Sequence, residues 1–108
     1  MKSLLKYFKY LDNEYQMHII DSYLKGSFPY AIWSNGKKNI KIVFDFTDTN
    51  PIHIFIYDAS DRAMYSYQEF ADEFKYYPKS NKDINGYIKV ASEKFYGILK
   101  QNKSILLG

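Results

Sequence analysis

Apolar residues near the start of the chain recur at helical spacing. Behind a polar residue come Leu4 and Leu5, then Phe8 four and three positions later, and Leu11 three positions after that. With Ser3 as the N-cap, they predict a short amphipathic helix over residues 3–12. The next run, residues 15–24, is rich in β-branched and aromatic residues and predicts a strand. Extension of the first helix into this run is an alternative.

A hairpin is the clearest local feature of the sequence. Asn35-Gly36 separates two runs of β-forming residues, near 28–34 and 37–46. This dipeptide favours a type I′ turn, because both residues tolerate positive φ, and the two runs should therefore pair antiparallel. In that pairing one face is uniformly apolar, and we assign to the core Pro29, Ala31, Trp33, Ile40, Ile42, Phe44 and Phe46.

Strict alternation returns over residues 52–58, after a turn that ends at Pro51. Ile52, Ile54 and Ile56 continue the core face, and the intervening residues point the other way. The reverse face of the sheet would then carry Tyr30, Ile32, Lys41, Val43, Phe55 and Tyr57. This face is too aromatic to be simply solvated.

Two helices are expected after the sheet. Ser66-Tyr67-Gln68-Glu69 fits a capping box, and the apolar stripe that follows it ends at Pro78. A last helix spans about 82–102 and is interrupted by Gly86 and Gly97. The expected fold is therefore α+β, with the order αββββαα. Residues 1–108 form a single domain, in which an antiparallel four-stranded meander carries an N-terminal helix and two C-terminal helices on one face.

The composition excludes several classes of chemistry. The 108 residues include no cysteine, which leaves no disulfide, no thiol nucleophile and no cysteine-ligated metal. The two histidines, His18 and His53, have no serine beside them, and phosphate-binding glycine loops are missing. No apolar run is long enough for a secretion signal or a membrane span, which predicts a cytoplasmic protein without a membrane partner. We expect no enzyme activity, cofactor or metal, the alternative being a site assembled from scattered residues.

Two pairs of aspartates share an i, i+3 spacing at strand ends, Asp45 with Asp48 and Asp58 with Asp61. Four carboxylates would suit Mg²⁺ or a glycosidase. The two pairs, however, flank a strand of about seven residues and are separated by roughly 20 Å. They therefore cannot share one ion, and hydrogen bonds that stabilise turns explain them better.

The net charge of +3 conceals three consecutive blocks of charge whose sign alternates along the chain. Residues 1–44 carry +4, residues 45–73 carry −6 and residues 74–108 carry +5. Solvated loops and helix faces would account for the acidic block, and the alternative is a patch that steers a basic partner.

Tyrosine is unusually frequent, with 12 residues in the chain. It suits protein recognition because it offers a large rigid area at a low entropy cost. Tyr57 and Tyr65 flank a charged loop in the acidic block. We therefore assign partner binding to Tyr57, Asp58, Asp61, Tyr65, Glu69 and Asp72.

In element order, size and missing catalytic machinery, the chain resembles the immunity proteins of bacterial polymorphic toxin systems. The resemblance covers the whole chain in pattern: the short first helix, the strand Ile52–Asp58, and the lysine-rich terminal helix that ends at Gly108. It implies a cytoplasmic α+β inhibitor that blocks a cognate protein toxin domain by occlusion, and it transfers no binding residues. Many such inhibitors of basic nucleases are acidic, whereas this chain is basic on average. The acidic block would then meet the basic surface of the toxin.

A small nucleic-acid-binding or phage-encoded regulatory protein is the alternative. The lysines and aromatic residues of the reverse face and its hairpin resemble a platform on which bases stack: Lys37, Lys38, Lys41, Tyr30, Phe55 and Tyr57. A single arginine and the acidic block weigh against nucleic acid as the partner. Weak homodimerisation is also left open.

Overall fold

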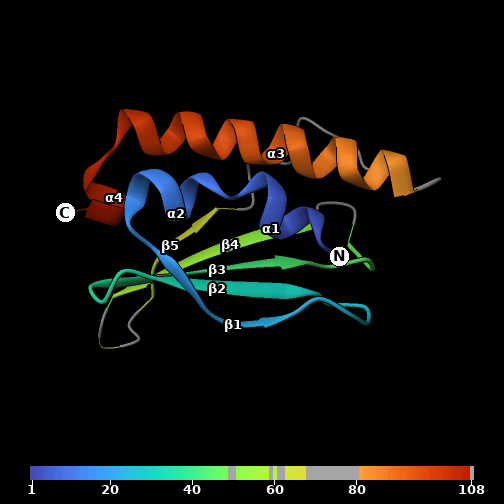
Figure 1. Cartoon of the computed structure of the whole chain (residues 1–108), viewed down its shortest axis with the longest axis horizontal. Helices are drawn as coiled ribbons and strands as arrows, with labels where there is room; N and C mark the ends of the chain where they lie inside the picture. Colours follow the sequence, from blue (N-terminus) through green and yellow to red (C-terminus); the bar gives the residue numbers. More distant parts are fainter. Residues whose placement is uncertain (49–50, 59, 61–62, 68–80, 108) are drawn as a thin grey trace.

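A computed structural model of the chain describes residues 1–48, 51–58, 60, 63–67 and 81–107 (Figure 1), with only the backbone described at 63–67 and 81–83. Two short helices come first, α1 (Ser3–Tyr7) and α2 (Tyr10–Tyr15). Five strands follow: β1 (His18–Tyr23), β2 (Tyr30–Ser34), β3 (Lys38–Phe44), β4 (Ile52–Asp58) and β5 (Ala63–Tyr67). A long helix, α3 (Asn81–Gln101), and a short one, α4 (Ser104–Leu107), complete the described elements.

The strands form one antiparallel sheet in the order β1-β2-β3-β4-β5, and the helices lie on one face of it (Figure 1). The expected α+β meander with N-terminal and C-terminal helices is confirmed. The sheet has one strand more than expected, because β5 pairs with β4 and places Ser66 opposite Phe55. The expected capping box at Ser66 is therefore wrong, since a tyrosine-rich segment completes the hydrogen bonds of a strand edge instead. The rest of that expected helix lies outside the described residues.

The N-terminal segment differs in detail from the expected single helix. It contains two helices, and α1 starts at Ser3 without a side-chain cap, so Ser3 is a helical residue and not the N-cap. Gln16 ends α2 in the left-handed conformation, with φ 57°. Because the chain leaves the helical path there, the following run forms the expected strand rather than an extension of the helix.

The hairpin between β2 and β3 keeps its expected faces but not its expected turn. Gly36 has φ 84°, whereas Asn35 is not among the described residues with positive φ, so a type I′ turn is excluded. Instead, the Asn35 side chain accepts a hydrogen bond of 2.9 Å from the backbone N–H of Lys38. Ser34 pairs with Asn39, two positions beyond the expected partner. Since side chains alternate with a period of two, this shift leaves the residues of β2 and β3 on their expected faces.

The core lies between the sheet and the helices. The predicted core residues of the three central strands are completely buried: Ala31, Trp33, Ile40, Ile42, Phe44, Ile52, Ile54 and Ile56. They pack against Phe8 from the N-terminal segment and Phe95 from α3. Phe46 is an exception, because it lies beyond the end of β3 and is 39% exposed.

Helix α3 confirms the expected last helix and is tied to the N-terminal helices by hydrogen bonds. The Tyr10 hydroxyl donates to the backbone carbonyl of Ser92 at 2.9 Å. The Ser92 hydroxyl, in turn, donates to the carbonyl of Tyr7. These bonds hold the helical layer together behind the sheet. Among the helices in the described residues, none combines the length and the apolar character that a bilayer crossing requires.

Candidate functional site

The face of the sheet that points away from the helices carries a continuous set of aromatic and apolar side chains. Strand pairing brings together its members from four strands: Tyr23, Tyr30, Ile32, Lys41, Val43, His53, Phe55 and Tyr57. We call these residues the open face. In the described part of the chain, no helix or strand lies over it (Figure 1).

Three rings follow one another along β4 on the open face. His53 and Phe55 are stacked, with ring centroids 6.4 Å apart and planes 14° apart. The Phe55 and Tyr57 centroids are 6.5 Å apart. All three side chains are half-buried, and the isoleucines between them in the strand are anchored in the core. The result is a rigid aromatic strip that a partner would meet in its final conformation.

The polar groups on this face converge on one tyrosine. The Tyr30 hydroxyl donates a hydrogen bond of 3.0 Å to the Asp21 carboxylate. Lys41 Nζ lies 4.8 Å from the centroid of the Tyr30 ring, a cation–π contact. The hydrogen bond to Asp21 raises the pKa of the Tyr30 phenol above its ordinary value. A cation and an anion are therefore held at fixed positions beside the aromatic strip.

The open face continues into the edge strand β1. All six residues of β1 are exposed, and in the described sheet this strand pairs only with β2. Ile20 is 58% exposed, Tyr23 57%, and Phe28 in the following loop 54%. Apolar side chains gathered at a strand edge are typical of a surface that binds another protein.

The residues assigned to partner binding from the sequence do not all lie together. Tyr57 is on the open face beside Phe55. Asp58 is the next residue in β4 and pairs with Lys38, whose buried side chain reaches α4 on the helix side. Because successive residues of a strand point to opposite faces, Tyr57 and Asp58 lie on opposite sides of the sheet.

The other assigned residues are described only in part. The backbone of Tyr65 belongs to β5 and pairs with Ile56. The Tyr65 side chain and residues Asp61, Glu69 and Asp72 lie outside the described structure.

The aspartates at the strand ends make the expected turn hydrogen bonds. Asp45 accepts hydrogen bonds from the backbone and the hydroxyl of Thr47, at 2.8 and 2.5 Å. The bond from the Thr47 hydroxyl lowers the pKa of Asp45. Asp58 accepts the same two bonds from Ser60, at 3.0 and 2.8 Å. Turn stabilisation is therefore the role that the structure supports for both residues.

His53 has a carboxylate neighbour that its isolated place in the sequence did not indicate. Its Nε2 atom lies 3.1 Å from the carboxylate of Asp48. Together with Asp45, these residues offer ligand atoms within 4.8 Å of one another. The turn between β3 and β4 brings these three residues together.

The lysines considered for nucleic-acid contact are also separated. Lys41 lies on the open face, but Lys38 is only 8% exposed and its Nζ donates to the carbonyl of Ser104 at 2.7 Å. Lys38 therefore serves the packing of α4 against the sheet. Its position could not be predicted because Ser104 is distant in the sequence.

Comparison of the chain with protein-family models, with curated proteins and with solved structures found no match. The candidate function therefore rests on the open face and the edge strand beside it.

Proposed function

We propose that this chain is a non-enzymatic binding protein that blocks a protein partner by covering it with the open face. The observation that carries the proposal is the rigid strip of His53, Phe55 and Tyr57 on a face that no described element covers. Aromatic anchors of this kind supply much of the binding free energy of protein interfaces, at about 2 kcal/mol or more for each central residue. Fixed by the core behind them, they lose little conformational entropy on binding.

The specific role that we propose is that of an immunity protein, which neutralises a cognate toxin domain by occlusion in the cytoplasm. This role needs a rigid recognition surface and no bond-making chemistry, and the open face meets that need. The proposed toxin domain has a basic surface, attracted by the acidic block of residues 45–73. Steering of this kind acts over about a Debye length, roughly 8–10 Å, so Asp58 can contribute from the other side of the strand.

Binding kinetics with a toxin domain encoded beside this chain test the proposal. The double variant Phe55→Ser/Tyr57→Ser should raise the dissociation rate at least tenfold, because it removes two anchors. Leu107→Ser is the matched control, since Leu107 is 45% exposed but lies in α4. Asp58→Lys should instead slow association and reduce its dependence on salt. A wild-type dissociation rate for a folded double variant would exclude the open face as the contact surface.

Nucleic-acid binding is a second candidate, favoured by Lys41 and Tyr30 beside Phe55. Asp21, hydrogen-bonded to Tyr30, places a negative charge beside the same surface. Titration with a labelled single-stranded oligonucleotide at several salt concentrations separates the two candidates. Affinity that falls linearly with salt on logarithmic axes, and is lost in Lys41→Glu, would favour nucleic acid over a protein toxin.

A further inference from the structure

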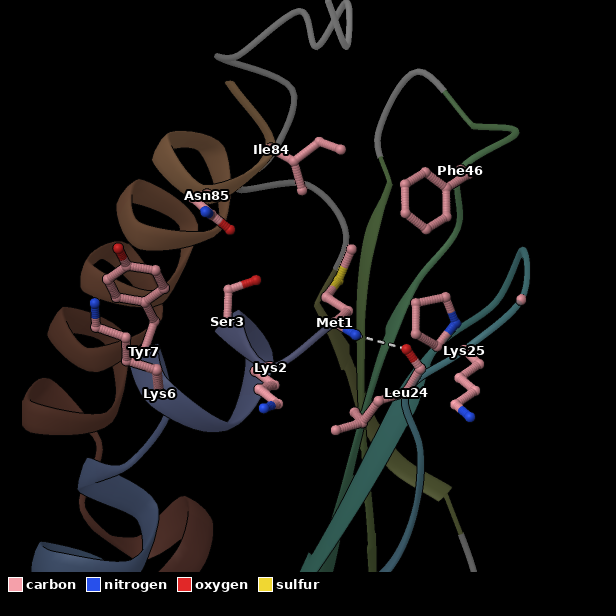
Figure 2. A pocket seen from close by; sticks show the side chains of 12 residues that line it. Met1, Lys2, Ser3, Lys6, Tyr7, Leu24, Lys25, Phe46, Ile84 and Asn85 are labelled. Carbon is pink, nitrogen blue, oxygen red and sulfur yellow. Dashed lines mark hydrogen bonds between the residues drawn. The ribbon is translucent and has the colours of Figure 1, made fainter. Parts of the chain in front are cut away.

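A cavity of about 610 Å³ lies near the N-terminus, on the helix side of the sheet (Figure 2). Its walls come from α1, from the loop between β1 and β2, and from the start of α3. The amino nitrogen of Met1 donates to the carbonyl of Leu24 at 2.6 Å, which joins α1 to that loop. The volume is within the range of small-molecule sites, about 300–1,000 Å³. This cavity is separate from the open face, which lies on the other side of the sheet.

The described part of the cavity lining is cationic. Lys2, Lys6 and Lys25 contribute to it, and none of the lining residues that the structure describes is acidic. Within the described residues, Lys2 and Lys25 form no ion pair, and Lys6 lies over the ring of Tyr7 with its Nζ 5.2 Å from the centroid. Three positive charges on a concave surface, with no carboxylate among the described lining residues, create a potential that attracts an anion.

Besides the lysines, the cavity lining contains apolar side chains. Ile84 and Phe46 line the cavity and lie on either side of the Met1 side chain (Figure 2). Phe46 is 39% exposed, so part of its ring is free to contact a ligand. Near them, Ser3 and Asn85 add a hydroxyl and an amide from α1 and α3. The lining thus combines an apolar surface with cationic groups and two neutral polar groups.

We propose that this cavity binds a small organic anion with a ring-sized apolar body. A phosphate or carboxylate group would bind near Lys2 and Lys25, and the apolar body would pack against Phe46 and Ile84, while Lys6 beside Tyr7 adds to the positive potential. The proposal is independent of the open face, because the two sites share no residue.

An NMR titration of the ¹⁵N-labelled chain tests this proposal with three probes: 1-naphthyl phosphate, 1-naphthol and inorganic phosphate. Naphthyl phosphate should shift the backbone amides of Ser3, Lys25 and Asn85 saturably, and it should bind at least tenfold more tightly than either of the other probes. The lack of a saturable shift at these amides would overturn the proposal. Equal binding of inorganic phosphate would do so too, because the apolar body would then contribute nothing.

Matched charge variants distinguish binding of naphthyl phosphate in this cavity from its attraction by the net charge of the protein. Lys2→Glu/Lys25→Glu should weaken naphthyl phosphate binding at least tenfold. Lys37→Glu/Lys103→Glu changes the net charge equally at exposed positions outside the cavity lining and should change the affinity less than twofold. Equal losses in the two double variants would show that net charge alone attracts the probe. Phe46→Ser, which keeps all charges, should also weaken binding of naphthyl phosphate but not of inorganic phosphate.

Discussion

Trp33 donates its indole N–H to the carboxylate of Asp12 at 3.0 Å, and this bond links the centre of the sheet to α2. Trp33 is completely buried, so its single donor has to find a partner inside the protein. Asp12 also lies 3.6 Å from Lys9 Nζ. The largest side chain of the core is thus oriented by a charged acceptor from the helical layer.

Loss of this acceptor should destabilise the fold measurably. Asp12→Ala leaves the buried indole N–H without a partner, and we expect the free energy of unfolding to fall by about 1–3 kcal/mol in urea denaturation. Asp12→Asn keeps a carbonyl acceptor and should lose less. Lys9→Ala controls for the ion pair, which is exposed and should contribute less than about 1 kcal/mol. Equal losses for Asp12→Ala and Asp12→Asn would contradict the role assigned to the hydrogen bond.

The alternation of residues along the strands predicted which side chains form the core. Ile52, Ile54 and Ile56 show why, since a period of two is a local property of an extended chain and needs no knowledge of its neighbours. The same property explains why the faces of the hairpin were right although its turn was not. Asn35 uses its side chain to accept backbone hydrogen bonds, a choice that depends on the surrounding loop.

Tyr57 and Asp58 were assigned to one patch because they are adjacent in sequence, although the same alternation already places them on opposite faces of the sheet. Contacts between distant segments, in contrast, could not be predicted from a local pattern. The cationic cavity was missed because Lys2 and Lys25 are brought together only when α1 packs beside the loop after β1. The count of charges along the chain showed that residues 1–44 are basic. It could not show that Lys2 and Lys25 line the same cavity.

Glycine substitutions should have opposite effects in α3 and in the hairpin. A Cβ added at Gly86 would meet no atom within 4 Å, so Gly86→Ala should raise the free energy of unfolding by about 1 kcal/mol through helix propensity. A Cβ at Gly36 also has space, but φ is 84° there, and Gly36→Ala should lower stability by about 1–2 kcal/mol. Urea denaturation of the two variants provides the measurement. A stabilised Gly36→Ala would show that the hairpin turn does not need the left-handed backbone.

Tyr10 should make the protein sensitive to alkaline pH. Burial raises the pKa of its phenol well above the ordinary value, while its hydroxyl donates to the Ser92 carbonyl. In the unfolded chain Tyr10 loses its proton near pH 10, whereas in the folded chain it stays protonated. The unfolded state therefore binds fewer protons above pH 10, and the free energy of unfolding falls as the pH rises. This contribution is fully present below about pH 10, and one such group gives a slope of up to about 1.4 kcal/mol per pH unit.

Urea denaturation between pH 7 and pH 11 compares Tyr10→Phe with the unmodified chain. At pH 7 the variant should be less stable by about 1 kcal/mol, because it lacks the hydrogen bond to Ser92. Above pH 10 the difference should shrink and then reverse, since phenylalanine has no proton to lose. Ser92→Ala is the matched control, because it removes the hydroxyl that bonds to the Tyr7 carbonyl and, at 3.3 Å, to the Tyr10 hydroxyl, but keeps the buried titrating phenol. It should lower stability while leaving the steep alkaline decline in place. Parallel curves for Tyr10→Phe and the unmodified chain up to pH 11 would mean that Tyr10 is not the group responsible.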